Sequence, residues 1–144
     1  MVRLTVDGKV FEQPFTVKMD PRVKTSFVSL LQQHDLSVRC YNSRKECMEI
    51  LQEIKSARAL LKNQPAKKEL DKKLSLLENS PLASDETSFG RLNNAFASIF
   101  NILQETDMPA TTQTIRAFGE TQSKFKNLVL KWQELKKGLP PKNN

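Results

Sequence analysis

The chain has 144 residues, a length typical of a single domain that can bury a substantial core. Its 23 Lys and Arg residues against 16 Asp and Glu give a formal net charge of +7, which permits nucleic acid or an anionic membrane surface as a partner. No stretch approaches the roughly 20 consecutive apolar residues of a membrane-spanning helix, so we expect no membrane span.

Residues 2–19 have the pattern of a β-hairpin. Apolar and polar residues alternate over residues 2–6, and the pair Asp7-Gly8 that follows favours a tight turn, because both central positions of such a turn take positive φ. The alternation returns over residues 15–19, whereas Pro14 removes one hydrogen-bond donor and predicts an edge position or a bulge. A lone hairpin is marginally stable in water, so we expect it to join a sheet or to be covered by a helix.

The pair Asp20-Pro21 marks the boundary between the hairpin and the first helix. The helix can begin there, or at Thr25 or Ser26 after an extended linker, and the later start is favoured. Apolar residues at helical spacing continue to about residue 62, which predicts one long helix with one buried face; a kink is cheapest at residues 41–43. The apolar residues are Phe27, Leu30, Leu31, Val38, Tyr41, Met48, Leu51, Ile54, Ala57 and Leu61.

Three further helices are predicted over residues 66–78, 86–105 and 111–137, between segments that contain proline. In the last helix the apolar residues step by three and four, close to the 3.5-residue spacing of a coiled-coil seam, and Gln122 interrupts that seam. The seam residues are Ile115, Phe118, Phe125, Val129 and Trp132. This helix should therefore pack nearly parallel or antiparallel to a neighbour.

Short connections between long amphipathic helices predict antiparallel neighbours. We therefore expect a mainly α protein. An antiparallel bundle of three to four helices over residues 20–139 follows an N-terminal β-hairpin over residues 1–19 and precedes a disordered tail over residues 140–144. The aromatic residues are expected to form the core rather than to line a ligand site; they are Phe89, Phe96, Phe100, Phe118, Phe125 and Trp132.

We find no sequence motif for catalysis, a cofactor or a metal ion. His34 has no partner for catalysis on its own face, because the neighbouring Asp35 points about 100° away around the helix. Cys40 and Cys47 are too far apart for a disulfide if they lie in one helix, so two free thiols are expected. The glycines are isolated, which excludes a Walker loop and a dinucleotide fingerprint. We expect no enzymatic activity and no cofactor.

The densest basic cluster is a candidate contact for an anion or for nucleic acid. Glu69 and Asp71 interrupt it, and no aromatic residue is interleaved for base stacking. Nucleic-acid binding is therefore the alternative rather than the favoured function. The cluster consists of Lys67, Lys68, Lys72 and Lys73.

The hairpin offers a surface of another kind. If no sheet covers it, one side of Phe11, Phe15 and Val17 is exposed, and this edge can pair with a strand of a partner. We therefore expect a protein partner, or self-association, through the hairpin edge or through a helix face.

Residues 2–8 and 15–23, including the segment Val-Lys-Met-Asp-Pro-Arg-Val, resemble the last strand pair of an immunoglobulin-like module. Residues 90–94, residues 107–111 and Trp132 resemble the helical tail that follows such a pair in bacterial secreted proteins with sialidase-type or sortilin-like Asp-box β-propellers. The resemblance covers most of the chain and implies the C-terminal segment of a secreted or periplasmic parent. The chain has no Asp-box and no room for propeller blades, so no catalytic residue of that family is implied here, and the earlier strands of the module are missing.

These observations favour a non-enzymatic structural or protein-interaction module that corresponds to the C-terminal part of a propeller protein. The alternative is a basic helical bundle that binds nucleic acid or an anionic surface. Because no signal peptide precedes the first strand, the chain as written is expected in the cytoplasm.

Overall fold

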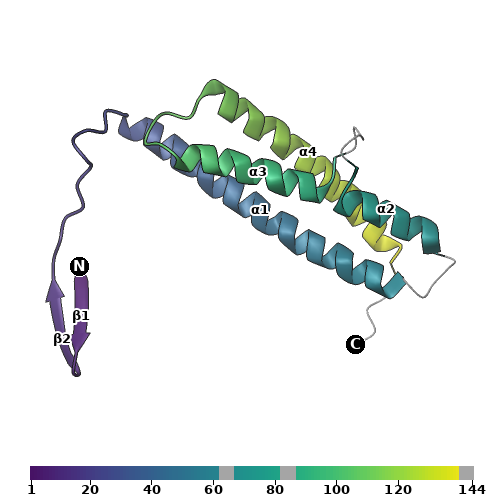
Figure 1. The fold of residues 1–144 in the computed structure, drawn as a ribbon, viewed down its shortest axis with the longest axis horizontal. Helices are drawn as coiled ribbons and strands as arrows, with labels where there is room; N and C mark the ends of the chain where they lie inside the picture. The colour runs from purple at the N-terminus through teal and green to yellow at the C-terminus, as the bar shows by residue number, and fades with distance from the viewer. Residues whose placement is uncertain (62–66, 82–86, 140–144) are drawn as a thin grey trace.

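The computed structural model describes residues 1–61, 67–81 and 87–139. Three long helices lie side by side, a shorter helix covers one end of them, and a two-stranded hairpin stands apart at the end of an extended segment (Figure 1). This confirms the predicted mainly α bundle with an N-terminal hairpin. The elements are β1 (Val2–Val6), β2 (Lys9–Gln13), α1 (Phe27–Leu61), α2 (Lys68–Glu78), α3 (Phe89–Gln104) and α4 (Thr112–Lys137). The predicted tail over residues 140–144 lies outside the described residues.

The hairpin turns at the predicted pair, where Asp7 has φ of 48° and Gly8 has φ of 74°. The strands pair antiparallel, with Leu4 opposite Phe11. The predicted second arm was too long, because β2 ends at Gln13 instead of continuing to residue 19. Pro14 has no N–H to donate, and the residues beyond it run past the end of β1.

Helix α1 has the favoured later start and is continuous. The Ser29 N–H donates to the Ser26 side-chain oxygen at 3.2 Å, so Ser26 caps the first turn. The helix passes without a break through residues 41–43, where a kink was predicted to be cheapest. Ser43 is buried there, and its hydroxyl donates to Oε1 of Gln122 on α4 at 3.0 Å. The polar residue that interrupts the α4 seam therefore has a polar partner on α1.

Apart from Ser37, the buried residues of α1 repeat at alternating steps of three and four. This 3.5-residue spacing is the spacing of a coiled-coil seam, which stays on one face only when the helices wind around each other with a left-handed twist. We call this face the inner seam. The inner seam consists of Gln33, Leu36, Cys40, Ser43, Cys47, Ile50, Ile54, Ala57 and Leu61. It lies against α3 along most of that helix, the most extensive contact between elements in the described part of the chain.

The sequence prediction of a single apolar face on α1 was therefore wrong for the first half of the helix. Ile54, Ala57 and Leu61 are buried as predicted. Five other apolar residues point away from the bundle: Phe27, Leu31, Val38, Tyr41 and Met48. Both sets of residues have helical spacing, and the buried set contains small and polar side chains such as Cys40 and Ser43 that hydropathy alone does not select.

The facing helices supply the large side chains of the core, as predicted. Phe96 packs edge-on against Phe125 with ring centroids 5.9 Å apart, and it also contacts Phe118 at 6.1 Å. Phe89 and Trp132 are buried in the same cluster, and Phe100 is partly buried against it. On α4 the first buried position is Thr114 instead of the predicted Ile115, which is exposed.

Polar contacts tie the start of α1 to the turn between α3 and α4. The Gln33 side-chain amide donates to the Leu103 carbonyl and to the Thr106 carbonyl, the latter at 2.6 Å. The Thr25 hydroxyl donates to the Asp107 carbonyl at 2.5 Å. The last carbonyls of a helix have no partner within the helix, so Gln33 satisfies groups that burial would otherwise leave unpaired.

The two cysteines are free and fully buried in the inner seam, as expected for packing residues. Burial raises the pKa of the Cys40 thiol to about 11, although the charge of Arg39 acts in the opposite direction. Burial, reinforced by the charge of Glu46, raises the pKa of the Cys47 thiol to about 12. Both groups are therefore protonated at neutral pH and behave as small apolar side chains.

We expect Phe96→Ala to lower the free energy of unfolding by about 3–5 kcal/mol, because it leaves a cavity where α3 faces two phenylalanines of α4. Ile102→Ala is the matched control on the same helix, since Ile102 is 53% exposed. Urea unfolding followed by circular dichroism measures both variants. Equal losses for the two would contradict the assignment of the core.

The buried thiols predict a loss of stability at alkaline pH. Unfolded thiols release their protons above about pH 8.5, whereas the folded chain keeps those of Cys40 and Cys47 up to about pH 11 and 12. Because the folded state then binds more protons, the free energy of unfolding should fall as pH rises through this window. The double variant Cys40→Ala with Cys47→Ala should show a shallower pH dependence in the same unfolding assay. Parallel curves for the two proteins would refute the prediction.

Candidate functional site

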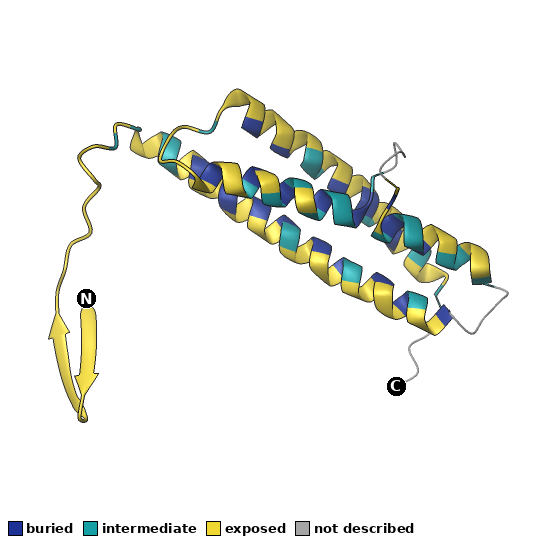
Figure 2. Cartoon of the chain, viewed as in Figure 1, coloured by how far each residue is buried: buried dark blue, intermediate teal, exposed yellow. Residues whose placement is uncertain are grey.

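The hairpin presents an apolar face to solvent. Alternate residues of a strand point to the same side, so Leu4 and its partner Phe11 share a face with Val2 and Val6 of β1. Leu4 is 59% exposed and Phe11 is 57% exposed, and every residue from 1 to 22 is exposed (Figure 2). We call the apolar residues of this surface the hairpin apolar face; they are Val2, Leu4, Val6 and Phe11, and the same side also carries Gln13 opposite Val2 and Lys9 opposite Val6.

The opposite face of the hairpin is more polar. The guanidinium of Arg3 lies 2.5 Å from the carboxylate of Glu12, and these residues are directly opposite one another in the register. The other pair on this face is Thr5 with Val10. The hairpin is therefore amphipathic in the way that is typical of a sheet packed on one side only, yet both of its sides are in contact with solvent.

An extended segment with apolar alternation follows β2. Phe15, Val17 and Met19 are all exposed in it. The segment ends in a local turn, in which the Val23 N–H donates to the Asp20 carbonyl at 3.0 Å. The Arg22 guanidinium also hydrogen-bonds the Asp20 carboxylate, and this bond lowers the pKa of that carboxyl group.

Of the three residues predicted to form a partner-strand edge, Phe11 lies in β2, while Phe15 and Val17 lie in the extended segment. The structure does not bring these three together in one paired strand. Sequence reasoning left Val2, Leu4 and Val6 out of the candidate site. Their alternation was visible, but it was used only to identify the strand.

The predicted basic cluster is divided between two sides of α2. Lys68 and Lys72 lie beside Arg58 of α1, whereas Lys73 lies on the side that faces α4. The Arg58 guanidinium donates to Asp71 at 2.8 Å and to Glu78 at 2.6 Å. Both bonds raise the pKa of Arg58, and the bond to Asp71 has the larger effect on it. They fasten α2 to α1 and direct two acidic groups of α2 toward the bundle. The remaining predicted residue, Lys67, is partly buried just before α2.

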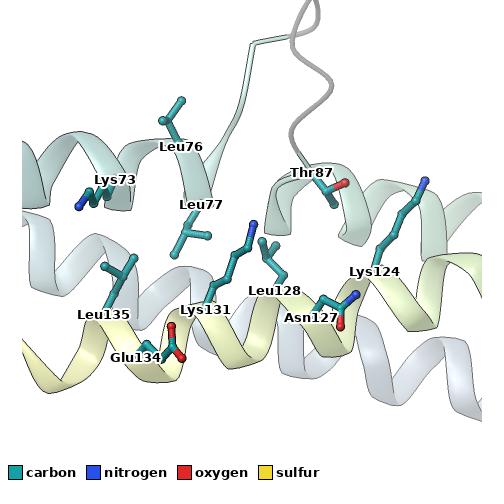
Figure 3. A pocket seen from close by; sticks show the side chains of 10 residues that line it. All are labelled: Lys73, Leu76, Leu77, Thr87, Lys124, Asn127, Leu128, Lys131, Glu134 and Leu135. Atoms are coloured by element: carbon teal, nitrogen blue, oxygen red, sulfur yellow. The ribbon is translucent and has the colours of Figure 1, made fainter.

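A shallow groove of about 650 Å³ runs between α2 and α4 (Figure 3). Lys73 approaches it from α2, and Lys124 and Lys131 approach it from α4. Its floor is apolar and includes Leu77 and Leu128. Sequence reasoning did not select the two lysines of α4, although their separation of seven residues places them on one face of a helix. The groove is thus an apolar surface whose rim carries three lysines and one acidic residue, Glu134.

We also searched the described ranges for chemistry of other kinds. His34 lies exposed on α1. Within residues 1–61, 67–81 and 87–139, no three His, Cys, Asp or Glu side chains lie close enough together to hold a metal ion. In the same residues, none of the helices combines the length and apolar composition needed to cross a bilayer.

Comparisons of the chain with protein-family models, with curated proteins and with solved structures find no match. The resemblance to the C-terminal segment of Asp-box propeller proteins therefore stays a prediction.

Proposed function

We propose that the chain is a non-enzymatic protein-interaction module that docks through its N-terminal hairpin. The observation that carries the proposal is the exposure of every residue from 1 to 22, which include the hairpin apolar face and five further large apolar side chains: Met1, Val10, Phe15, Val17 and Met19. Contiguous apolar surface of this kind is typical of contacts with other macromolecules.

The free energy of the hairpin supports a partner. A two-stranded sheet in water is marginally stable, and three strands or a packed face are needed for independent stability. Covering Leu4 and Phe11 would contribute about 1.5–3 kcal/mol for each side chain that becomes fully buried. A sheet or helix of a partner laid on this face thus supplies what the hairpin lacks.

The extended segment offers backbone groups as well. Residues 15–19 alternate apolar and polar side chains without a facing strand, so their N–H and C=O groups are available for β-augmentation. Strands of an immunoglobulin-like module would fit this edge, because the resemblance to Asp-box propeller proteins places the strand pair in such a module. In that case the function is structural: the hairpin completes a sheet and the bundle follows it.

Replacing the centre of the hairpin apolar face should abolish the interaction. We expect Leu4→Thr with Phe11→Thr to reduce retention of a specific partner from an extract of the source organism by about ten-fold or more, since threonine keeps β-propensity but removes apolar area. Val10→Thr is the matched control in the same strand, because Val10 is equally exposed on the opposite face. Quantitative mass spectrometry measures the proteins retained by the unchanged chain, by the double variant and by the Val10→Thr control.

Two results would contradict the proposal. One is a set of retained proteins that does not differ between the double variant and the Val10→Thr control. The other is slow amide hydrogen exchange in β1 and β2 of the isolated monomer, at the level of the bundle helices, which would show a hairpin that is stable without a partner.

A second candidate function is binding to nucleic acid or another polyanion. The groove between α2 and α4 favours it, because Lys73, Lys124 and Lys131 come from two helices and lie along one groove. The ion pair between Arg58 and Asp71 also supports this candidate. Because the Asp71 carboxylate pairs with Arg58, it neutralises less of the positive charge of the neighbouring lysines than its place in the sequence suggests.

Retention on heparin tests this second candidate. If the groove binds polyanions, Lys73→Gln with Lys131→Gln should elute at lower salt and reduce the slope of log affinity against log salt by about one to two. The control is Lys55→Gln on α1 with Lys126→Gln on α4, which removes the same charge outside the groove. Equal shifts for the two pairs would indicate non-specific attraction by net charge, and no retention at low salt would eliminate the candidate.

A further inference from the structure

Helix α1 has a second line of side chains with coiled-coil spacing, on the face opposite the inner seam. Its members step by four and three throughout the first half of the helix. We call it the outer seam; it consists of Phe27, Leu31, His34, Val38, Tyr41, Lys45 and Met48. Every member is exposed, and Phe27 is 70% exposed. The exposed face of α1 in Figure 2 contains this line.

The regular spacing has a physical meaning. An ideal helix drifts by about 20° per heptad relative to a 3.5-residue repeat, so large apolar side chains on an exposed face have no reason to follow that repeat, yet five of the seven members are apolar. Packing of the inner seam already gives α1 a left-handed twist. With this twist, residues that repeat every 3.5 positions stay on one face of the helix. The outer seam is therefore shaped for a second helix that packs on the far side of α1 by knobs into holes.

The surface of the outer seam also contains a groove. A shallow groove of about 620 Å³ lies over its second half. Tyr41, Arg44, Lys45 and Met48 are spaced as the four residues of one hole in such packing. Lys45, Met48, Glu49 and Gln52 form the next hole. These holes can each receive one side chain from a facing helix.

We propose that a second copy of this chain occupies the outer seam, with the two α1 helices antiparallel and the two-fold axis between Val38 and Tyr41. In this arrangement Val38 of each copy packs against Tyr41 of the other, and Leu31 packs against Met48. Six of the seven seam positions thus pair with one another, whereas Phe27 lies opposite Gln52 of the second copy, outside the seam. A two-fold interface must be self-complementary in this way, and residues 31–48 of this seam are.

The polar members of the seam select the antiparallel direction. A parallel pair would place Lys45 against Lys45 of the second copy in the centre of the interface, and like charges in that position are destabilising. The antiparallel pair places Lys45 beside His34 instead. On the flank, Asp35 of one copy then lies near Asn42 of the other, so no like charges face each other there.

The size of the interface sets its strength. Seven seam positions with their flanks are fewer than the roughly 20–30 residues per side of a standard interface, so we expect a dissociation constant in the micromolar range. This surface is separate from the hairpin apolar face. The dimer therefore does not depend on the proposed hairpin function, and either can fail without the other.

Sedimentation equilibrium of the full chain, from about 5 μM to about 500 μM, tests the proposal. We expect a monomer–dimer equilibrium, and Val38→Glu should weaken it by about ten-fold or more. Leu130→Glu on α4 is the matched control, since Leu130 is 60% exposed and lies outside the seam; it should leave the dissociation constant within about two-fold. Circular dichroism verifies that both variants fold.

Disulfide trapping then tests the direction of the helices. A mixture of Val38→Cys and Tyr41→Cys chains should give mainly the mixed disulfide, because those positions face each other in the antiparallel pair; Cys40 and Cys47 are buried and should not react. Homodisulfides as the main product would overturn the antiparallel arrangement. Two results would overturn the seam as the site of association. One is a monomer at every concentration. The other is a dimer that Val38→Glu leaves intact but that Leu4→Thr with Phe11→Thr disrupts.

Discussion

The structure depends on the packing of the α1 inner seam against the aromatic side of α3 and α4. Phe96 lies at the centre, in contact with Phe118 and Phe125, and small residues of α1 such as Cys40 and Cys47 allow these rings to approach the helix. Small residues thus occupy the middle of the inner seam, whereas Leu36, Ile50, Ile54 and Leu61 of the same seam supply large buried side chains on either side of it in the sequence. The core is dense, and other apolar residues of α1, such as Val38 and Met48, remain exposed to solvent.

Polar groups within the seam define the register of the bundle. Ser43 pairs with Gln122, and Gln33 pairs with the final carbonyls of α3. A polar side chain buried at one position disfavours any other alignment of the helices, since the slipped alignment would leave it unpaired. Arg58 has the corresponding role for α2, because it holds two of the three acidic residues of that helix, Asp71 and Glu78, against α1. The positions of the surface lysines follow from these contacts.

Apolar surface is distributed unevenly in this molecule. The bundle buries a complete core, whereas the hairpin apolar face and the outer seam of α1 remain exposed. Both surfaces keep the regular spacing of packed structure, two residues in the strands and 3.5 residues in the helix. Exposed residues without a partner are under no physical requirement to keep such spacing. The regularity therefore supports the two associations proposed above.

The sequence by itself determined the classes of the elements, the hairpin turn at Asp7-Gly8 and the aromatic core, because each of these depends on residues that are close together in the chain or on a simple spacing. It left the start of α1 open between Asp20-Pro21 and the favoured Thr25 or Ser26, and the structure identifies Ser26 as the cap. Only the tertiary structure decided which of the two seams of α1 is covered. Both have helical spacing, and the covered one contains Ser43 and two cysteines that hydropathy does not mark as core. It also decided that Lys73 joins Lys124 and Lys131, and that Pro14 ends the pairing of the hairpin. The physical reason is that the spacing of apolar residues is a property of one helix, whereas burial requires two helices and depends on where the second one lies.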